Sequence, residues 1–282
     1  MPLVTIEDDF DLEKIADSGQ CFRAKEISPG VFRFITLNHA IDMQKVEEET
    51  FQISCGASEW ELIWSKYFDI QTNYAEIRKE INDFGEGRRC GEYLKLATEF
   101  GKGIRILRQD PFETLISFII SQRKSIPAIK TAVELICTSF GDQIKTADGS
   151  VVNAFPLVDE LCQVSAFDLS KFSLGYRSAY VHDALQRVKG LMIALDDLYG
   201  VSDDDLLDTL KTIRGVGDKV AACVALYAYH RFACVPVDVW IKRAIQEDFH
   251  GENVFVEFGS LAGVLQQYIF YYKRFGEKEL IY

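Results

Sequence analysis

The chain has 282 residues, 48% hydrophobic and 26% charged, which is the composition of a globular protein with a sizeable core. No apolar run is as long as a membrane span, and the acidic N-terminus lacks the basic-then-apolar order of a signal peptide. The seven cysteines are scattered without a C-x-x-C pair and the four histidines are isolated, which predicts no disulfide framework, bound metal or organic cofactor. We therefore expect a soluble, intracellular protein, in the cytoplasm or nucleoid if its source is bacterial.

The net charge of −12 argues against a nucleic-acid partner, because phosphates bind to positive surfaces. The charge is uneven, however, since residues 101–130 hold six basic and only two acidic side chains. The six basic residues are Lys102, Arg105, Arg108, Arg123, Lys124 and Lys130. A basic face on an acidic protein and a solvated charge run on a helix both fit this pattern.

The first part of the chain, from about residue 20 to residue 55, is typical of β-strands. Residues 31–37 (VFRFITL) and 50–55 (TFQISC) are rich in β-formers with partly alternating polarity, and residues 28–30 (SPG) predict a turn before the first of them. From residues 58–68 (SEWELIWSKYF) onward the pattern is helical. We predict an α+β fold: an N-terminal twisted antiparallel sheet domain, residues 1–112, and a mostly helical two-lobed body, residues 113–282.

Four helices are predicted in the body, each from its spacing of apolar residues. They cover residues 110–122, 126–141, 177–192 and 202–213. Asp110 is expected to cap the first, with Pro111 as its first residue, and Gly141 to end the second. Ser202, followed by three acidic residues, suits the start of the fourth.

Residues 204–230 predict two helices joined by a tight turn, Gly215-Val216-Gly217. Both glycines permit positive φ and close approach of another backbone, and the free N–H groups at the start of the second helix suit a phosphate. Such a turn is also common between helices that bind nothing. Lys219 adds a chemical signal, because the positive end of the helix dipole disfavours its charged form and only a neutral amine is a nucleophile. Cys223, four residues on, shares its helix face.

Asp238 lies in the apolar run FACVPVDVW, nineteen residues after Lys219. A carboxylate buried there without partners would be costly, so we expect it to cap a helix from Val239 onward or to take part in a reaction. The two roles are compatible.

The glycine hairpin, Lys219 and the sequence VPVDV together resemble the helix-hairpin-helix, Gly-Pro-Asp superfamily of base-excision DNA glycosylases. From about residue 20 to residue 272 the chain is similar to its 8-oxoguanine DNA glycosylase / AP lyase family. SGQCFR, LGYRSAYV and AGVLQQYIF correspond to that family's S-G-Q-x-F-R, L-G-Y-R-x-x-Y-V and A-G-x-x-Q-x-x-x-F elements.

The resemblance implies a lesion-base pocket. The Gly19 carbonyl would accept a hydrogen bond from N7–H of oxidised guanine, which normal guanine lacks, and Gln266 would read the Watson–Crick edge of the flipped base. Phe270 and Cys223 would stack on its two faces, and four-residue spacing puts Gln266 and Phe270 on one helix face.

The resemblance also implies a DNA-binding set: Gly215, Gly217, Tyr176, Arg177, Arg123, Lys124 and Trp240. Tyr176 would be the wedge that kinks the duplex, and Arg177 would reach the orphaned base. Three departures from the family pattern stand out. Arg123-Lys124-Ser125 replaces three asparagines, Ala128 stands where an arginine would read cytosine, and Trp240 replaces a phosphate-binding histidine. We therefore predict a relaxed preference for the base opposite the lesion.

The implied activity is that of a monomeric DNA glycosylase with AP (β-)lyase activity, which excises 8-oxoguanine from double-stranded DNA through a Lys219 Schiff base, with Asp238 stabilising positive charge at C1′. Two alternatives remain. An alkylated-purine glycosylase of the same superfamily would usually lack Lys219. A non-catalytic helix-hairpin-helix DNA-binding protein would not need Lys219 and Asp238 together with the Gln266 and Phe270 pair.

Overall fold

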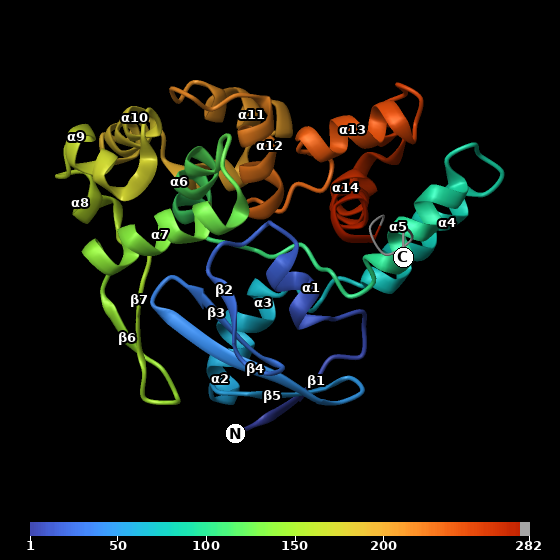
Figure 1. Ribbon diagram of the computed structural model, residues 1–282, viewed down its shortest axis with the longest axis horizontal. Coiled ribbons are helices and arrows are strands. Elements are labelled where there is room, and N and C mark those ends of the chain that lie inside the picture. The colour runs from blue at the N-terminus through green and yellow to red at the C-terminus, as the bar shows by residue number, and fades with distance from the viewer. Residues whose placement is uncertain (277–282) are drawn as a thin grey trace.

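The N-terminal part of the chain is a five-stranded antiparallel sheet with the strand order β1-β5-β4-β3-β2, in a computed structural model that describes residues 1–276 (Figure 1). The strands are β1 Leu3–Thr5, β2 Ala24–Ser28, β3 Val31–Thr36, β4 His39–Glu47 and β5 Thr50–Ile53. The predicted turn joins β2 to β3. Phe34 of β3 pairs with Ile41 of β4, and both side chains are fully buried.

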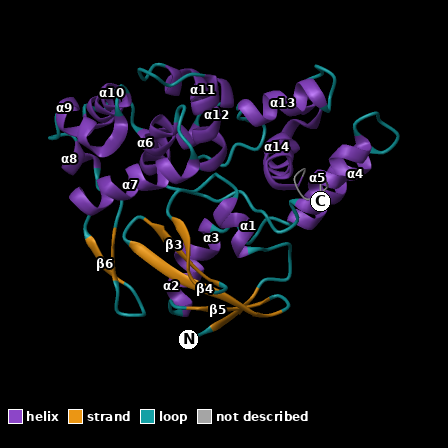
Figure 2. Ribbon diagram, in the orientation of Figure 1, coloured by secondary structure: helices purple, strands orange, loops and turns teal. Residues whose placement is uncertain are grey.

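Short helices cover the sheet: α1 Leu12–Asp17, α2 Ala57–Glu59, the π-helical turn η1 Trp60–Trp64, and α3 Ser65–Tyr67. Figure 2 shows α1 and α3 between the sheet and the helical body. The core of this part is aromatic, with Phe68 packing edge-on against Phe34 at 5.0 Å between ring centroids. Burial of this apolar face is what holds the sheet to the helices above it.

The rest of the chain is mostly helical and has its own continuous apolar core. Its helices are α4 Tyr74–Gly85, α5 Gly91–Phe100, α6 Pro111–Ser121, α7 Ile126–Phe140, α8 Val158–Leu161, α9 Ala166–Leu169, η2 Ser170–Leu174, α10 Arg177–Lys189, η3 Leu195–Gly200, α11 Asp203–Lys211, α12 Asp218–Tyr227, α13 Val239–Glu247, η4 Val254–Leu261, α14 Ala262–Tyr271 and η5 Tyr272–Gly276. In Figure 1, α6 to α12 form one group and α4, α5, α13 and α14 another. The predicted α+β class, with a two-lobed helical body, is confirmed. The last six residues of the predicted second domain lie outside the described residues.

The helix ends follow the predicted signals closely. The Asp110 side chain accepts from the backbone N–H of Glu113 at 2.8 Å at the start of α6, and the Ser202 hydroxyl caps α11 in the same way. Gly141 ends α7, where a Cβ would lie 1.9 Å from the carbonyl oxygen of Ala154. The helix predicted over residues 177–192 ends earlier, at Lys189, because Gly190 closes it.

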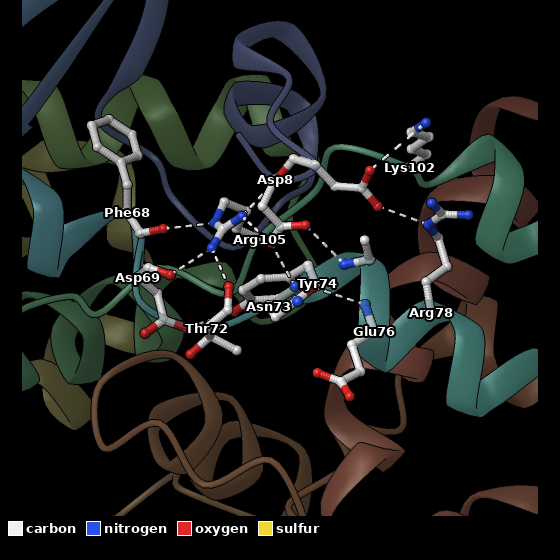
Figure 3. A network of polar contacts seen from close by, with 12 residues as sticks. Asp8, Phe68, Asp69, Thr72, Asn73, Tyr74, Glu76, Arg78, Lys102 and Arg105 are labelled. Atoms are coloured by element: carbon white, nitrogen blue, oxygen red, sulfur yellow. Dashed lines mark hydrogen bonds and ion pairs between the residues drawn. The ribbon is translucent and has the colours of Figure 1, made fainter. Parts of the chain in front are cut away.

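The two parts are joined by Arg105, whose side chain is fully buried (Figure 3). All five of its N–H groups have acceptors: the Asp8 carboxylate and the backbone carbonyls of Asp9, Phe68, Asp69 and Thr72, at 2.6 to 3.0 Å. This set of bonds ties the segment before α6 to the chain just before α1 and just after α3.

The basic segment therefore does not form one basic face. Arg105 is internal, and Arg108 pairs with the buried Asp69 carboxylate at 2.9 Å. Further along, Lys130 donates to the carbonyl of Ala24, whereas Arg123 is exposed. Much of the positive charge thus neutralises acidic groups of the N-terminal part. Among residues 1–276, no helix combines the length and apolar character that a membrane crossing requires.

A two-stranded hairpin that the sequence did not predict, β6 Gln143–Lys145 and β7 Val151–Asn153, extends from α7 toward the sheet. Arg33 of β3 pairs with Asp42 on the neighbouring strand at 2.6 Å and with Asp148 at the tip of this hairpin at 2.9 Å. The hairpin is a second link between the sheet and the helices.

Candidate active site

The helical hairpin joins α11 to α12 through Gly215 and Gly217, and the two glycines differ. Gly215 has a φ of +85°, and a Cβ there would lie 2.3 Å from the ring of Tyr180. Gly217 is the N-cap of α12 with a φ of −103°, and a Cβ there would meet nothing within 4 Å. Gly215 thus uses the positive φ that a glycine permits, whereas Gly217 does not. Gly217 instead leaves the first N–H groups of α12 open to solvent.

Lys219 is the second residue of α12 and is partly buried. Its Nζ lies 4.9 Å from the centroid of the Phe118 ring, on α6. Cys223, one turn further along α12, is buried beside it. Burial raises the pKa of the Cys223 thiol, and the adjacent Lys219 acts in the opposite direction. The Cys223 side chain is therefore a neutral, polarisable surface next to the amine.

Asp238 is the N-cap of α13, as predicted. Its Oδ1 accepts hydrogen bonds from the backbone N–H groups of Trp240 at 3.0 Å and Ile241 at 2.9 Å. Burial raises the pKa of Asp238, while the N–H of Ile241 and the charge of Lys219 act against that rise. Because Oδ1 makes both cap bonds, Oδ2 is not needed for the cap. Asp238 and Lys219, nineteen residues apart in the sequence, thus belong to one electrostatic site.

Gly19 and Phe270 come together from opposite ends of the chain. Gly19 has a φ of +79°, and a Cβ there would lie 3.1 Å from the Phe270 ring and 3.3 Å from the Ile126 side chain. Gln266, one turn before Phe270 on α14, is 2% exposed, and its Oε1 has no hydrogen-bond partner. An unpaired buried carbonyl costs about 1–3 kcal/mol, so this atom is an acceptor available to a ligand.

The residues predicted to fill and read the duplex gather at the start of α10 and the turn before α7. Tyr176 is half exposed, and the Arg177 guanidinium lies 4.4 Å from its ring centroid. Arg177 is buried, however, and donates to the backbone carbonyls of Gln122 and Leu174. Lys124 donates from Nζ to the Ser173 carbonyl at 2.7 Å. Arg177 must therefore leave these carbonyls before it can contact a base.

Trp240 lies in the first turn of α13, partly exposed, with the Arg243 guanidinium 5.0 Å from its ring centroid. The sequence interpretation missed Arg243, whose spacing of three from Trp240 places both on one helix face. It also missed Phe118 and Ile126, which are apolar residues at helical spacing and carry no signal of a site on their own.

A lysine at the start of a hairpin helix, an aspartate cap beside it and a buried amide with an unpaired oxygen are the arrangement expected of a DNA glycosylase of the helix-hairpin-helix class. A family model described as the 8-oxoguanine DNA glycosylase N-terminal domain matches residues 3–115. Together with relatives that match over most of their length, this shows that the chain belongs to the 8-oxoguanine DNA glycosylase/lyase family.

Individual relatives agree with this assignment. A probable N-glycosylase/DNA lyase of Methanothermobacter thermautotrophicus is 30% identical over 76% of this chain and 73% of that protein. The N-glycosylase/DNA lyase of Saccharomyces cerevisiae is 35% identical, and its match covers 52% of this chain and 42% of that protein's length. The 8-oxoguanine glycosylase/lyase of Clostridium acetobutylicum, solved with double-stranded DNA containing cytosine opposite 8-oxoguanine, is 33% identical with a TM-score of 0.88, over 98% of this chain and 99% of that one.

Proposed function

We propose that the protein excises 8-oxoguanine from double-stranded DNA and then cleaves the strand, acting as a monomer. The observation on which this depends most is the buried, unpaired Oε1 of Gln266, one turn from a Phe270 ring that rests against Gly19. A flipped purine presents N–H donors on its Watson–Crick edge, and such a donor would supply the hydrogen bond that this oxygen lacks. The Clostridium acetobutylicum relative, solved with 8-oxoguanine DNA, supports the choice of lesion.

In this proposal the Gly19 carbonyl accepts N7–H of the oxidised base, and Phe270 and Cys223 stack on its faces. Normal guanine has a lone pair at N7 instead of a proton, so its N7 would face the Gly19 carbonyl without a hydrogen bond. An unmade bond of this kind costs about 1–3 kcal/mol, which gives roughly 5- to 150-fold discrimination.

The reaction proceeds by covalent catalysis. The neutral Lys219 amine forms a bond to C1′ while the C1′–N9 bond breaks, its electron pair leaving with the base, which takes up a proton. The ionised Asp238 stabilises the positive charge that develops at C1′. Loss of the amine proton and opening of the C1′–O4′ bond, with protonation of O4′, give an imine. Removal of a C2′ proton then expels the 3′-phosphate, and water hydrolyses the imine to free Lys219.

Borohydride trapping tests the nucleophile, because it reduces the imine to a stable protein–DNA adduct. We expect the wild-type chain to give this adduct on 8-oxoguanine duplex and Lys219→Gln to give none. A covalent adduct with Lys219→Gln would show that another group attacks C1′. Asp238→Asn should keep duplex affinity and lose most turnover, and an unchanged rate would remove Asp238 from the mechanism.

We also propose that preference for the opposite base is relaxed. Ala128 offers no polar group to an orphaned base, and Arg177 is bound to the Gln122 and Leu174 carbonyls in the free protein. Arg123 and Lys124, together with Gly215, Gly217 and Trp240, then contribute phosphate contacts that position the duplex without selecting a base. The test is excision of 8-oxoguanine opposite C, A, G and T. A strong preference for cytosine would contradict the proposal.

A further inference from the structure

Beside the candidate site, three buried polar groups connect α12, α14 and the segment that contains Gly19. The Gln267 side chain is fully buried on α14, next to Gln266. Its Nε2 donates to the backbone carbonyl of Ser18 at 2.6 Å, and the Tyr227 hydroxyl donates to its Oε1 at 2.7 Å. A carbonyl can only accept, so the amide nitrogen must face Ser18, and the tyrosine hydroxyl must be the donor on the other side.

These bonds hold the peptide group immediately before Gly19. Because a peptide unit is planar, fixing the Ser18 carbonyl also fixes the N and Cα of Gly19. The peptide that follows Gln20 is held as well, because the Gln20 backbone carbonyl accepts from Gln109 Nε2 at 2.9 Å. The Gln20 side chain is also anchored: its Nε2 donates to the Arg105 carbonyl at 2.8 Å and its Oε1 accepts from the Leu107 N–H at 2.7 Å. The Gly19 carbonyl thus lies between two anchored peptides, at a φ of +79°.

The same contacts lead back to the candidate nucleophile. Lys219, Cys223 and Tyr227 follow one another at intervals of four along a single face of α12. The Tyr227 ring stacks on Phe118, with centroids 5.5 Å apart and planes 22° apart, and Lys219 lies over the same Phe118 ring at 4.9 Å. One helix face therefore presents the amine at its start and, two turns on, the hydroxyl that orients Gln267.

We infer that Gln267 and Tyr227 are positioning residues for lesion specificity: they fix the direction of the Gly19 carbonyl and its distance from the lysine-bearing helix. The inference rests on the proposed function, because it assumes that the Gly19 carbonyl reads the base. Neither residue touches the base or the sugar. Without these two side chains the backbone at Gly19 can rotate, because glycine has no side chain to restrain it. Strand cleavage at a site that already lacks its base should persist, because that reaction needs Lys219 but no recognition of a base.

The test compares two substrates with three variants. Gln267→Met keeps the length of the side chain and removes its donor, and Tyr227→Phe keeps the ring on Phe118 and removes only the hydroxyl. Tyr229→Phe is the matched control, because Tyr229 is a buried tyrosine whose hydroxyl donates to the Leu195 carbonyl, outside the candidate site. Each protein is assayed in single turnover on duplex with 8-oxoguanine and on duplex with an abasic site, and its thermal midpoint is recorded.

We expect Gln267→Met to slow 8-oxoguanine excision by about 10- to 100-fold and Tyr227→Phe by about threefold to tenfold. Strand cleavage and borohydride trapping at the abasic site should stay within about twofold of wild type for both. Tyr229→Phe should change neither reaction. Equal losses on the two substrates would mean that Gln267 only stabilises the fold, and an unchanged excision rate in Gln267→Met would also overturn the inference. A wild-type chain that cleaves abasic DNA but leaves 8-oxoguanine in place would refute the proposed substrate, and the inference with it.

Discussion

Replacing each glycine of the hairpin by alanine should separate two effects, one on folding and one on DNA binding. At Gly215 an L-residue is held at a φ of +85°, and its Cβ would lie 2.3 Å from the Tyr180 ring. The backbone strain costs about 1–2 kcal/mol and the overlap with Tyr180 about 1–3 kcal/mol. We therefore expect Gly215→Ala to lower the free energy of unfolding by about 2–5 kcal/mol.

Gly217→Ala meets neither obstacle, since its φ is −103° and its Cβ would stand in open space. Alanine is a poorer N-cap than glycine, so this change should cost about 1 kcal/mol, less than Gly215→Ala. Its methyl group would instead stand beside the first N–H groups of α12, where we propose that a phosphate binds. Losing one charge-assisted hydrogen bond weakens duplex binding by about tenfold.

Urea unfolding and fluorescence anisotropy with a duplex that carries a stable abasic-site analogue measure the two effects. Equal destabilisation by Gly217→Ala and Gly215→Ala would contradict the strain assigned to Gly215. Wild-type duplex affinity in Gly217→Ala would show that the N-terminus of α12 does not hold a phosphate.

Three further predictions concern buried charges. Burial raises the pKa of Asp238, and in the proposed mechanism its ionised form is the active one, so the excision rate should fall as pH drops through a value above the ordinary 3.8. A flat acid limb in a single-turnover pH profile would contradict this role. Burial also raises the pKa of Glu113 from 4.5 to about 7, so its contribution to stability is present below pH 4.5 and lost as pH rises through about 7. Relative to wild type, the free energy of unfolding of Glu113→Gln should be up to about 3 kcal/mol higher at pH 8 than at pH 4, as measured by urea unfolding. Equal differences at the two pH values would show that burial does not raise the pKa of Glu113. Arg105→Lys removes donors from several of the five buried acceptors and should cost about 3–5 kcal/mol, and an unchanged thermal midpoint would show that water replaces them.

The fold could be predicted where local signals decide it. The caps at Asp110, Ser202 and Asp238 are short-range hydrogen bonds between a side chain and the next turn, and all three are present. The β6–β7 hairpin was not predicted, because its place depends on Arg33, more than a hundred residues earlier in the chain. The buried position of Arg105 was missed because its acceptors lie far away in the sequence and four of the five are backbone carbonyls, which any sequence would supply.

The candidate site divides along similar lines. Lys219 and Cys223 are four residues apart, and so are Gln266 and Phe270. That each pair shares one helix face could therefore be predicted from the sequence. That Phe270 and Gly19 belong to one pocket came only from resemblance, and the Gln267–Ser18 bond had no sequence signal. The roles of these residues, and the division of the chain at residue 112, stay predictions.

The bond between Gln267 and Ser18 spans 249 residues of sequence, and it has a consequence for how the protein is made. The N-terminal sheet and most helices can fold as they leave the ribosome, since their contacts lie within stretches already synthesised. The pocket beside Gly19 cannot, because Gln266, Gln267 and Phe270 lie far later in the chain and must be synthesised before they can pack against it. A nascent chain that ends before α14 would expose the hairpin but lack the proposed lesion pocket. Competence to select a lesion would therefore arise only after α14 has left the ribosome.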